Sequence, residues 1–102
     1  MKISLLLASL MLAFGAQAAT PDEAMTKAGC MACHAKDKKL VGPAYQEIAR
    51  KNKGQADAQA RLVAKVRKGG SGVYGTVPMP PNDDKKISDA DLKVVITWIL
   101  KM

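Results

Sequence analysis

Hydrophobic and polar positions divide this chain into one apolar run followed by a helical pattern. Residues 3–14 are mostly apolar. After residue 19, apolar side chains recur every three or four positions, which is the period of an amphipathic helix, and no alternating run is long enough to indicate a strand. The pattern therefore predicts an all-α fold with about four helices.

The first predicted helix begins after Thr20 and continues into residues 30–34. Thr20 can cap it, Pro21 suits the first helical position, and Glu23 completes a capping box. Gly29 has two interpretations. It either lets another element pack closely, or it ends the helix before an irregular turn.

Three more helices are expected at about 44–51, at about 57–68, and after Ser88, which can cap the last one. Their predicted inward positions are Tyr45, Ile48 and Ala49, then Leu62, Val63 and Val66, then Leu92, Val95, Ile96 and Ile99. Trp98 lies one step off the last stripe. We expect it to pack against the first helix rather than to contact a cofactor.

The stretch Cys30-Met-Ala-Cys-His34 carries the candidate chemistry. In this pattern each thiolate adds to a vinyl group of haem c, and the histidine becomes the proximal iron ligand. Positions three apart share one face of a helical turn, so both sulfurs can meet one porphyrin. The motif therefore predicts one covalent haem c held by Cys30 and Cys33, with His34 on the iron.

Other interpretations of this motif fit less well. A thioredoxin-like dithiol expects a strand-helix-strand setting, and no strand pattern precedes the motif. Structural zinc needs four ligands, whereas the chain has only two cysteines and one histidine. A plain disulfide would give His34 no role.

The start of the chain resembles a secretory signal. Lys2 precedes the apolar run, and Ala16-Gln-Ala18 supplies small residues for cleavage after Ala18 or at the neighbouring bond. The alternative is a retained anchor, but the run is shorter than the roughly 20 residues that span a bilayer. We expect a cleaved signal peptide at 1–18 and one soluble domain at 19–102, exported to the periplasm, where haem attachment takes place in bacteria.

The charge indicates the kind of partner. The formal charge is +7, and loss of Lys2 with the signal leaves +6. Two ionised haem propionates would lower this to about +4. A basic protein favours acidic redox partners, and the lysines lack the interleaved aromatics that nucleic-acid binding needs. Seven lysines lie in segments that flank the cysteine motif or the proline-rich segment around Met79: Lys27, Lys36, Lys38, Lys39, Lys68, Lys85 and Lys86. Some of them could steer such a partner; alternatively, they are ordinary solvated surface charges.

Aromatic content predicts a thin core. There are one Trp, two Tyr and a single Phe, and that Phe lies in the apolar run. Small domains usually need a staple, and a buried porphyrin would supply the missing apolar body. We expect the chain without haem to be largely unfolded or molten.

Two loop positions are candidates to complete the iron site. A metal-bound imidazole usually donates its other N–H to a carbonyl or carboxylate. The carbonyl of Pro43 is the candidate, although residues 42–43 could be only a turn. Met79 stands on a segment stiffened by Pro78, Pro80 and Pro81, and with no second histidine available it is the candidate sixth ligand. The alternative is that Met79 fills the core, as most methionines do.

Segments 30–34, 41–45 and 72–82 together resemble the short bacterial class I cytochromes c, of the c-551 and c-552 type. The similarity runs in order over essentially all of residues 19–102. The segment Val77-Pro-Met-Pro-Pro-Asn82 is specific to that group. The resemblance implies about four helices wrapped around one haem c, with the first and last helices crossing.

For single residues the resemblance implies His34 and Met79 as axial ligands and the Pro43 carbonyl as the partner of the His34 ring. It implies that Asn82 donates a hydrogen bond near the Met79 sulfur. The helix crossing that it implies favours the close-packing role for Gly29.

Two positions depart from the family pattern. Tyr74 stands where many relatives have Trp, so a phenol would have to contact a propionate in place of an indole. Lys65 stands where some relatives have arginine near the propionates. Both leave the solvation of the propionates open.

The expected function is a soluble, monomeric one-electron carrier between respiratory complexes and terminal reductases or oxidases, and not an enzyme. With His34 and Met79 on the iron, no position is left for a substrate. One alternative is a haem-based sensor or peroxidase-like enzyme with a labile Met79. Another is a bound subunit of a larger oxidase or reductase.

Overall fold

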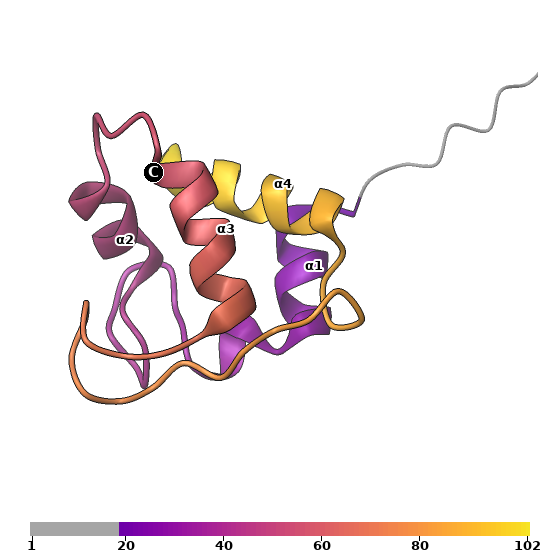
Figure 1. Ribbon diagram of the computed structural model, residues 1–102, viewed down its shortest axis with the longest axis horizontal. Coiled ribbons are helices and arrows are strands. Elements are labelled where there is room, and N and C mark those ends of the chain that lie inside the picture. Colours follow the sequence, from indigo (N-terminus) through magenta and orange to yellow (C-terminus); the bar gives the residue numbers. More distant parts are fainter. Residues whose placement is uncertain (1–18) are drawn as a thin grey trace, which may run out of the picture.

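The computed structural model describes residues 19–102, and the predicted signal peptide 1–18 lies outside them. Its elements are α1 (Pro21–Ala28), the short 3-10 helix η1 (Cys30–Ala32), α2 (Tyr45–Lys51), α3 (Ala58–Lys68) and α4 (Asp89–Leu100) (Figure 1). The all-α prediction is confirmed, since two isolated β-bridges are the only strand-like pairing in the described part. None of these helices is long and apolar enough to cross a membrane.

Helix α1 begins as the sequence predicts and ends earlier. The Glu23 amide donates to the Thr20 hydroxyl at 3.3 Å, and the Thr20 amide donates back to the Glu23 carboxylate at 3.4 Å. Gly29 then adopts φ +81 and closes the helix, and a Cβ there would meet nothing within 4 Å. The close-packing role for Gly29 is therefore wrong. This glycine supplies a left-handed backbone conformation, and the cysteine motif starts a separate turn.

Helix α4 is the element on which the others assemble. Within residues 19–102, α1, α2 and α3 each pack against α4, and no two of those three pack against each other. Figure 1 shows α4 running across α1 and α3, so the expected crossing of the first and last helices is confirmed. The predicted α4 stripe is fully buried: Leu92, Val95, Ile96 and Ile99.

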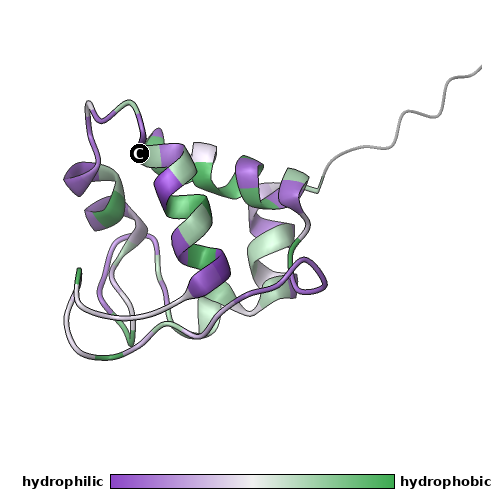
Figure 2. Ribbon diagram, viewed as in Figure 1, coloured by the Kyte–Doolittle hydropathy of each residue, from purple (hydrophilic) through white to green (hydrophobic). Residues whose placement is uncertain are grey.

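The buried core is small, and it gathers around α4. Ala24, Met25, Tyr45 and Ile87 complete its main cluster. The predicted inward stripe of α3 is only partly buried, because Leu62 and Val66 border a cavity rather than another helix. Figure 2 shows apolar residues in green on α3 and α4, while the loop leading into α4 is purple.

Trp98 joins more than one element. Its ring meets the Tyr45 ring of α2 edge-on, with 6.1 Å between centroids, and it shares a surface groove with Pro21 of α1. Trp98 does not border the cavity. Trp98 therefore has a neighbour on α2 as well as on the first helix, against which we expected it to pack.

Candidate functional site

The cysteine motif is shaped by the η1 turn. The amides of Cys33 and His34 both donate to the Cys30 carbonyl, at 3.2 and 3.0 Å. Both cysteines are half-buried free thiols, and both border the same cavity. Burial raises the pKa of the Cys30 thiol, its own backbone hydrogen bond opposes this, and Cys33 adds to it. The two sulfurs are therefore presented together to one cavity and do not form a disulfide.

The imidazole of His34 is buried and oriented by the loop that follows it. Its Nδ1 donates to the Pro43 carbonyl at 2.7 Å. A carbonyl can only accept, so Nδ1 carries the hydrogen and Nε2 is the nitrogen left to bind a metal. The loop is closed by the Gly42 amide, which donates to the Cys33 carbonyl at 2.7 Å.

Two close contacts restrict the ring further. A Cβ on Gly42 would lie 2.6 Å from His34 Cε1, so only glycine fits there without moving the imidazole. The Tyr45 ring stacks on the His34 ring at 5.2 Å between centroids and 19° between planes. The Gly42-Pro43 pair is therefore more than a turn, since one residue admits the ring and the other accepts its hydrogen bond.

Met79 is held against the end of α3. Gly70 and Met79 form a two-way backbone bridge, with N–H to carbonyl distances of 2.9 and 3.0 Å. Gly69, at φ +67, lets the chain approach so closely that a Cβ would clash with the Met79 carbonyl oxygen. The partly buried Met79 side chain borders the same cavity as Cys30 and His34.

This cavity has a volume of about 640 Å³, within the range of about 300–1,000 Å³ of sites that enclose cofactors. Figure 1 shows the two long loops, 33–44 and 69–82, on one side of the molecule, and both border the cavity. The rest of its wall is mainly aliphatic: Ile48, Leu62, Val66, Leu92, Val95, Ile96 and Ile99.

The donor set fits a haem better than a bare metal ion. Two thiols, one imidazole and one thioether open onto an apolar space, which suits a flat apolar macrocycle with an iron at its centre. Zinc needs a cage of charged or nitrogen ligands, and residues 19–102 hold no group of three or more His, Cys, Asp or Glu side chains that could form one.

Asn82 does not make the hydrogen bond that we expected. Its buried amide Nδ2 donates to the carbonyls of Pro80 at 3.0 Å and Val66 at 3.4 Å. The expected donation to the Met79 sulfur is absent from the hydrogen bonds of the described residues, because these two carbonyls engage the amide hydrogens. Asn82 borders the cavity, but here it ties the Met79 loop to α3.

Tyr74 and Lys65, the two departures from the family pattern, both border the cavity. The Lys51 ammonium lies 4.8 Å from the centre of the Tyr74 ring and also donates to the Val73 carbonyl at 3.2 Å. Burial raises the pKa of the Tyr74 phenol, although the Asn52 amide opposes this shift. Lys51, the last residue of α2, therefore holds the loop that contains Tyr74.

Sequence reasoning missed the contacts made by Gly42, Gly69 and Lys51. The glycines were assigned to a turn and a helix end, both of which are correct. Their close approaches, however, join residues eight and ten positions apart. The helical period of apolar residues gives no indication of contacts between such residues. The only sequence signal was that glycine stands beside each proposed ligand loop.

Comparisons with known proteins agree with this geometry. The sequence model of the family described as cytochrome c matches residues 19–102. The chain is 58% identical over 83 residues to cytochrome c2 of Rubrivivax gelatinosus, covering 81% of this chain and 98% of the relative. It is 44% identical to cytochrome c-551 of Pseudomonas aeruginosa over 96% of this chain and 91% of that one.

A solved structure shows the same fold. The crystal structure of cytochrome c552 from Nitrosomonas europaea superposes with a TM-score of 0.73 at 44% identity, covering 78% of this chain and 96% of that one. Together with the shared cavity of the two thiols and the imidazole, these similarities decide the family. The chain belongs to the cytochrome c family as a short class I member, an electron-transfer protein and not an enzyme, with one covalently attached haem c.

Proposed function

We propose that this cytochrome c is a periplasmic one-electron carrier with His34 and Met79 as the axial ligands of its iron. Cys30 and Cys33 would hold the haem through thioether bonds, each S–H adding across a vinyl double bond so that no atom leaves. The observation that carries the proposal is that the two thiols, the imidazole and the thioether all border one apolar cavity. When bound, haem c supplies an Fe(III)/Fe(II) couple, and His/Met ligation leaves no open position for a substrate.

The residues around His34 determine how strongly its imidazole donates to the iron and in which orientation the ring is held. The hydrogen bond to the Pro43 carbonyl fixes the tautomer and makes Nε2 a stronger donor. The space at Gly42 and the stacked Tyr45 ring hold the imidazole in one orientation. A ligand held in this way keeps the same geometry in both oxidation states, which suits rapid electron transfer.

The groups near the cavity mouth have a different role. Tyr74 and Lys65 are the polar side chains proposed to face the propionates, and Lys51 holds Tyr74 in place. Asn82 is proposed to fix the Met79 loop through the Pro80 carbonyl. The roles of Tyr74 and Lys65 rest on their position at the cavity.

The compartment follows from residues 1–18. Their basic start, short apolar run and Ala-Gln-Ala end are typical of a signal peptide. Cleavage after Ala18 or the next residue would release a soluble chain into the periplasm.

The proposed partners are acidic redox proteins that bind transiently to a monomer. Exposed apolar residues border the cavity mouth: Leu40, Val41, Val73 and Val77. Lys39 borders it too, and the net positive charge of the chain would speed encounter with an acidic surface. An apolar contact with positive charge beside it suits a partner that must dissociate after each electron.

Met79→Ala tests the ligand set. The ferric wild type should show the sulfur-to-iron charge-transfer band and resist dilute cyanide, whereas Met79→Ala should lose the band and bind cyanide readily. Met102→Ala, which removes an exposed methionine away from the cavity, is the control and should behave as wild type. A wild type without the band, or a Met79→Ala protein that retains it, would refute the proposed sixth ligand.

A further inference from the structure

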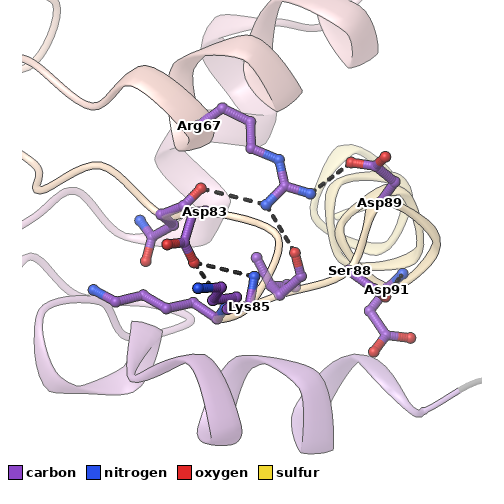
Figure 3. A network of polar contacts seen from close by, with 9 residues as sticks. Arg67, Asp83, Lys85, Ser88, Asp89 and Asp91 are labelled. Atoms are coloured by element: carbon purple, nitrogen blue, oxygen red, sulfur yellow. Dashed lines mark hydrogen bonds and ion pairs between the residues drawn. The ribbon is translucent and has the colours of Figure 1, made fainter.

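Arg67, near the end of α3, donates to three acceptors that lie between Asn82 and Asp89 (Figure 3). Its Nη1 lies 2.7 Å from the Ile87 carbonyl and 3.3 Å from the Asn82 carbonyl, and its Nη2 lies 2.6 Å from an Asp89 carboxylate oxygen. The Arg67 side chain is only 22% exposed, whereas that of Asp89 is 83% exposed. The guanidinium is thus enclosed among backbone carbonyls, with its carboxylate partner at the surface.

The three acceptors mark the two ends of the connection between the Met79 loop and α4. Asn82 closes the loop that carries Met79, and its backbone N–H donates to the Val66 carbonyl at 3.0 Å. Ile87 is buried in the core, and Asp89 is the first residue of α4. Arg67 therefore joins α3 to the end of the Met79 loop and to the start of the central helix.

The connection between these points is itself folded. One Asp83 carboxylate oxygen accepts the amides of Lys85 and Lys86, both at 3.1 Å (Figure 3). This turn brings Asn82 and Ile87 within reach of one guanidinium. Arg67 consequently closes a compact loop that directly follows the segment carrying Met79.

The other arginine ion pairs are local. Arg61 pairs with Asp57, and Arg50 with Glu47, each within four positions of its partner and largely exposed. Exposed pairs of this kind contribute little to stability. The role of Arg67 therefore depends less on charge than on its planar fork, which reaches several acceptors at once.

We propose that Arg67 is a positioning residue for Met79. By fixing the spacing between the Met79 loop and the start of α4, it sets how readily the sulfur leaves the iron. Arg67 does not border the cavity, so it acts through the backbone of residues 79–82. The inference rests on the proposed axial role of Met79.

The test uses the ferric holoprotein and compares Arg67→Gln, Arg67→Lys and Arg61→Gln. Arg61→Gln removes the same charge from the same helix but breaks only local contacts, the ion pair with Asp57 and a hydrogen bond to Gln55 at 2.6 Å. The readouts are the rate of cyanide binding and the temperature at which the sulfur-to-iron band disappears. Arg67→Gln should bind cyanide faster by on the order of fivefold to thirtyfold. Arg67→Lys should be intermediate, and Arg61→Gln should match wild type.

Thr20→Ala provides a second control for general loss of stability, because it weakens α1 at a distance from the Met79 loop. If Thr20→Ala accelerates cyanide binding as much as Arg67→Gln at an equal loss of stability, the positioning role is refuted. It is also refuted if Arg67→Gln behaves as Arg61→Gln. A wild type that lacks the sulfur-to-iron band would overturn the Met79 ligation itself, an outcome distinct from a normal band that is insensitive to Arg67.

Discussion

The imidazole of His34 is held by three neighbours with different physical effects. Pro43 accepts its hydrogen bond, Tyr45 stacks on it, and Gly42 leaves room for it. The first contact was predicted, since a metal-bound histidine needs an acceptor for its second nitrogen. The other two were not, because a one-dimensional pattern does not show which atoms approach one another.

Gly42→Ala should displace the His34 ring and cost about 1–3 kcal/mol of stability, the usual cost of overpacking. The added methyl would lie 2.6 Å from the ring, and the backbone of Gly42 needs no positive φ. Gly29→Ala is the contrast, because it strains a backbone at φ +81 but touches nothing within 4 Å. The haem absorption spectrum and midpoint potential should change in Gly42→Ala only. A shift of equal size in both variants would contradict the close-approach argument.

Tyr45 should make the protein sensitive to alkali. Burial raises the pKa of Tyr45 above the ordinary value of 10.0. The unfolded chain therefore releases the phenolic proton at a lower pH than the folded chain does. The associated stability is present below about pH 10 and is lost as the pH rises further.

Tyr45→Phe keeps the aromatic ring and removes that proton. Its free energy of unfolding should fall less than that of wild type between pH 8 and pH 11, as measured by denaturant titration at each pH. The two proteins should be similar at pH 8, since the hydroxyl donates only to the Met31 sulfur at 3.7 Å, a weak acceptor. Parallel losses in the two proteins would show that Tyr45 is not the titrating group.

At the scale of elements, the helices could be predicted, whereas most of the contacts that connect them could not. Local signals were enough to predict α1 and α4, namely the caps at Thr20 and Ser88 and the apolar stripe of α4. Gly29 was assigned correctly to a helix end in one interpretation, and the family resemblance favoured the wrong one. The expectation for Asn82 also failed, since its side-chain amide donates to the Pro80 carbonyl of its own loop and to the Val66 carbonyl of α3.

Thr20→Ala should cost about 1 kcal/mol of stability by removing the cap of α1. The loss should reach the whole fold because α1 packs directly on α4. Thr26→Ala, at an exposed position within the same helix, should be neutral or slightly stabilising, because alanine has the higher helix propensity. Denaturant unfolding of the two variants checks this. An equal cost for both would mean that the capping box contributes nothing.

For the whole molecule, the arrangement of helices leaves an interior that the chain does not fill. Three helices pack on α4 and not on one another within residues 19–102, and a cavity of about 640 Å³ lies against α2, α3 and α4. The thin core was predicted from the scarcity of aromatic residues. Its location was not, because that depends on how the two loops close over it.

The chain prepared without haem should therefore lose most of its helical structure. Far-ultraviolet circular dichroism should show a weak helical signal and no cooperative melt, while the holoprotein shows both. A Cys30→Ala/Cys33→Ala protein without haem gives the comparison without chemical extraction. A native-like signal with a cooperative melt would contradict the view that the macrocycle supplies the missing core.

Mass spectrometry of the exported, purified protein is the most direct measurement of the central claim. The account predicts the mass of residues 19–102 plus one haem, with the haem on the proteolytic peptide that contains Cys30 and Cys33. A mature chain without added haem, or with haem on a peptide that lacks these two cysteines, would contradict it.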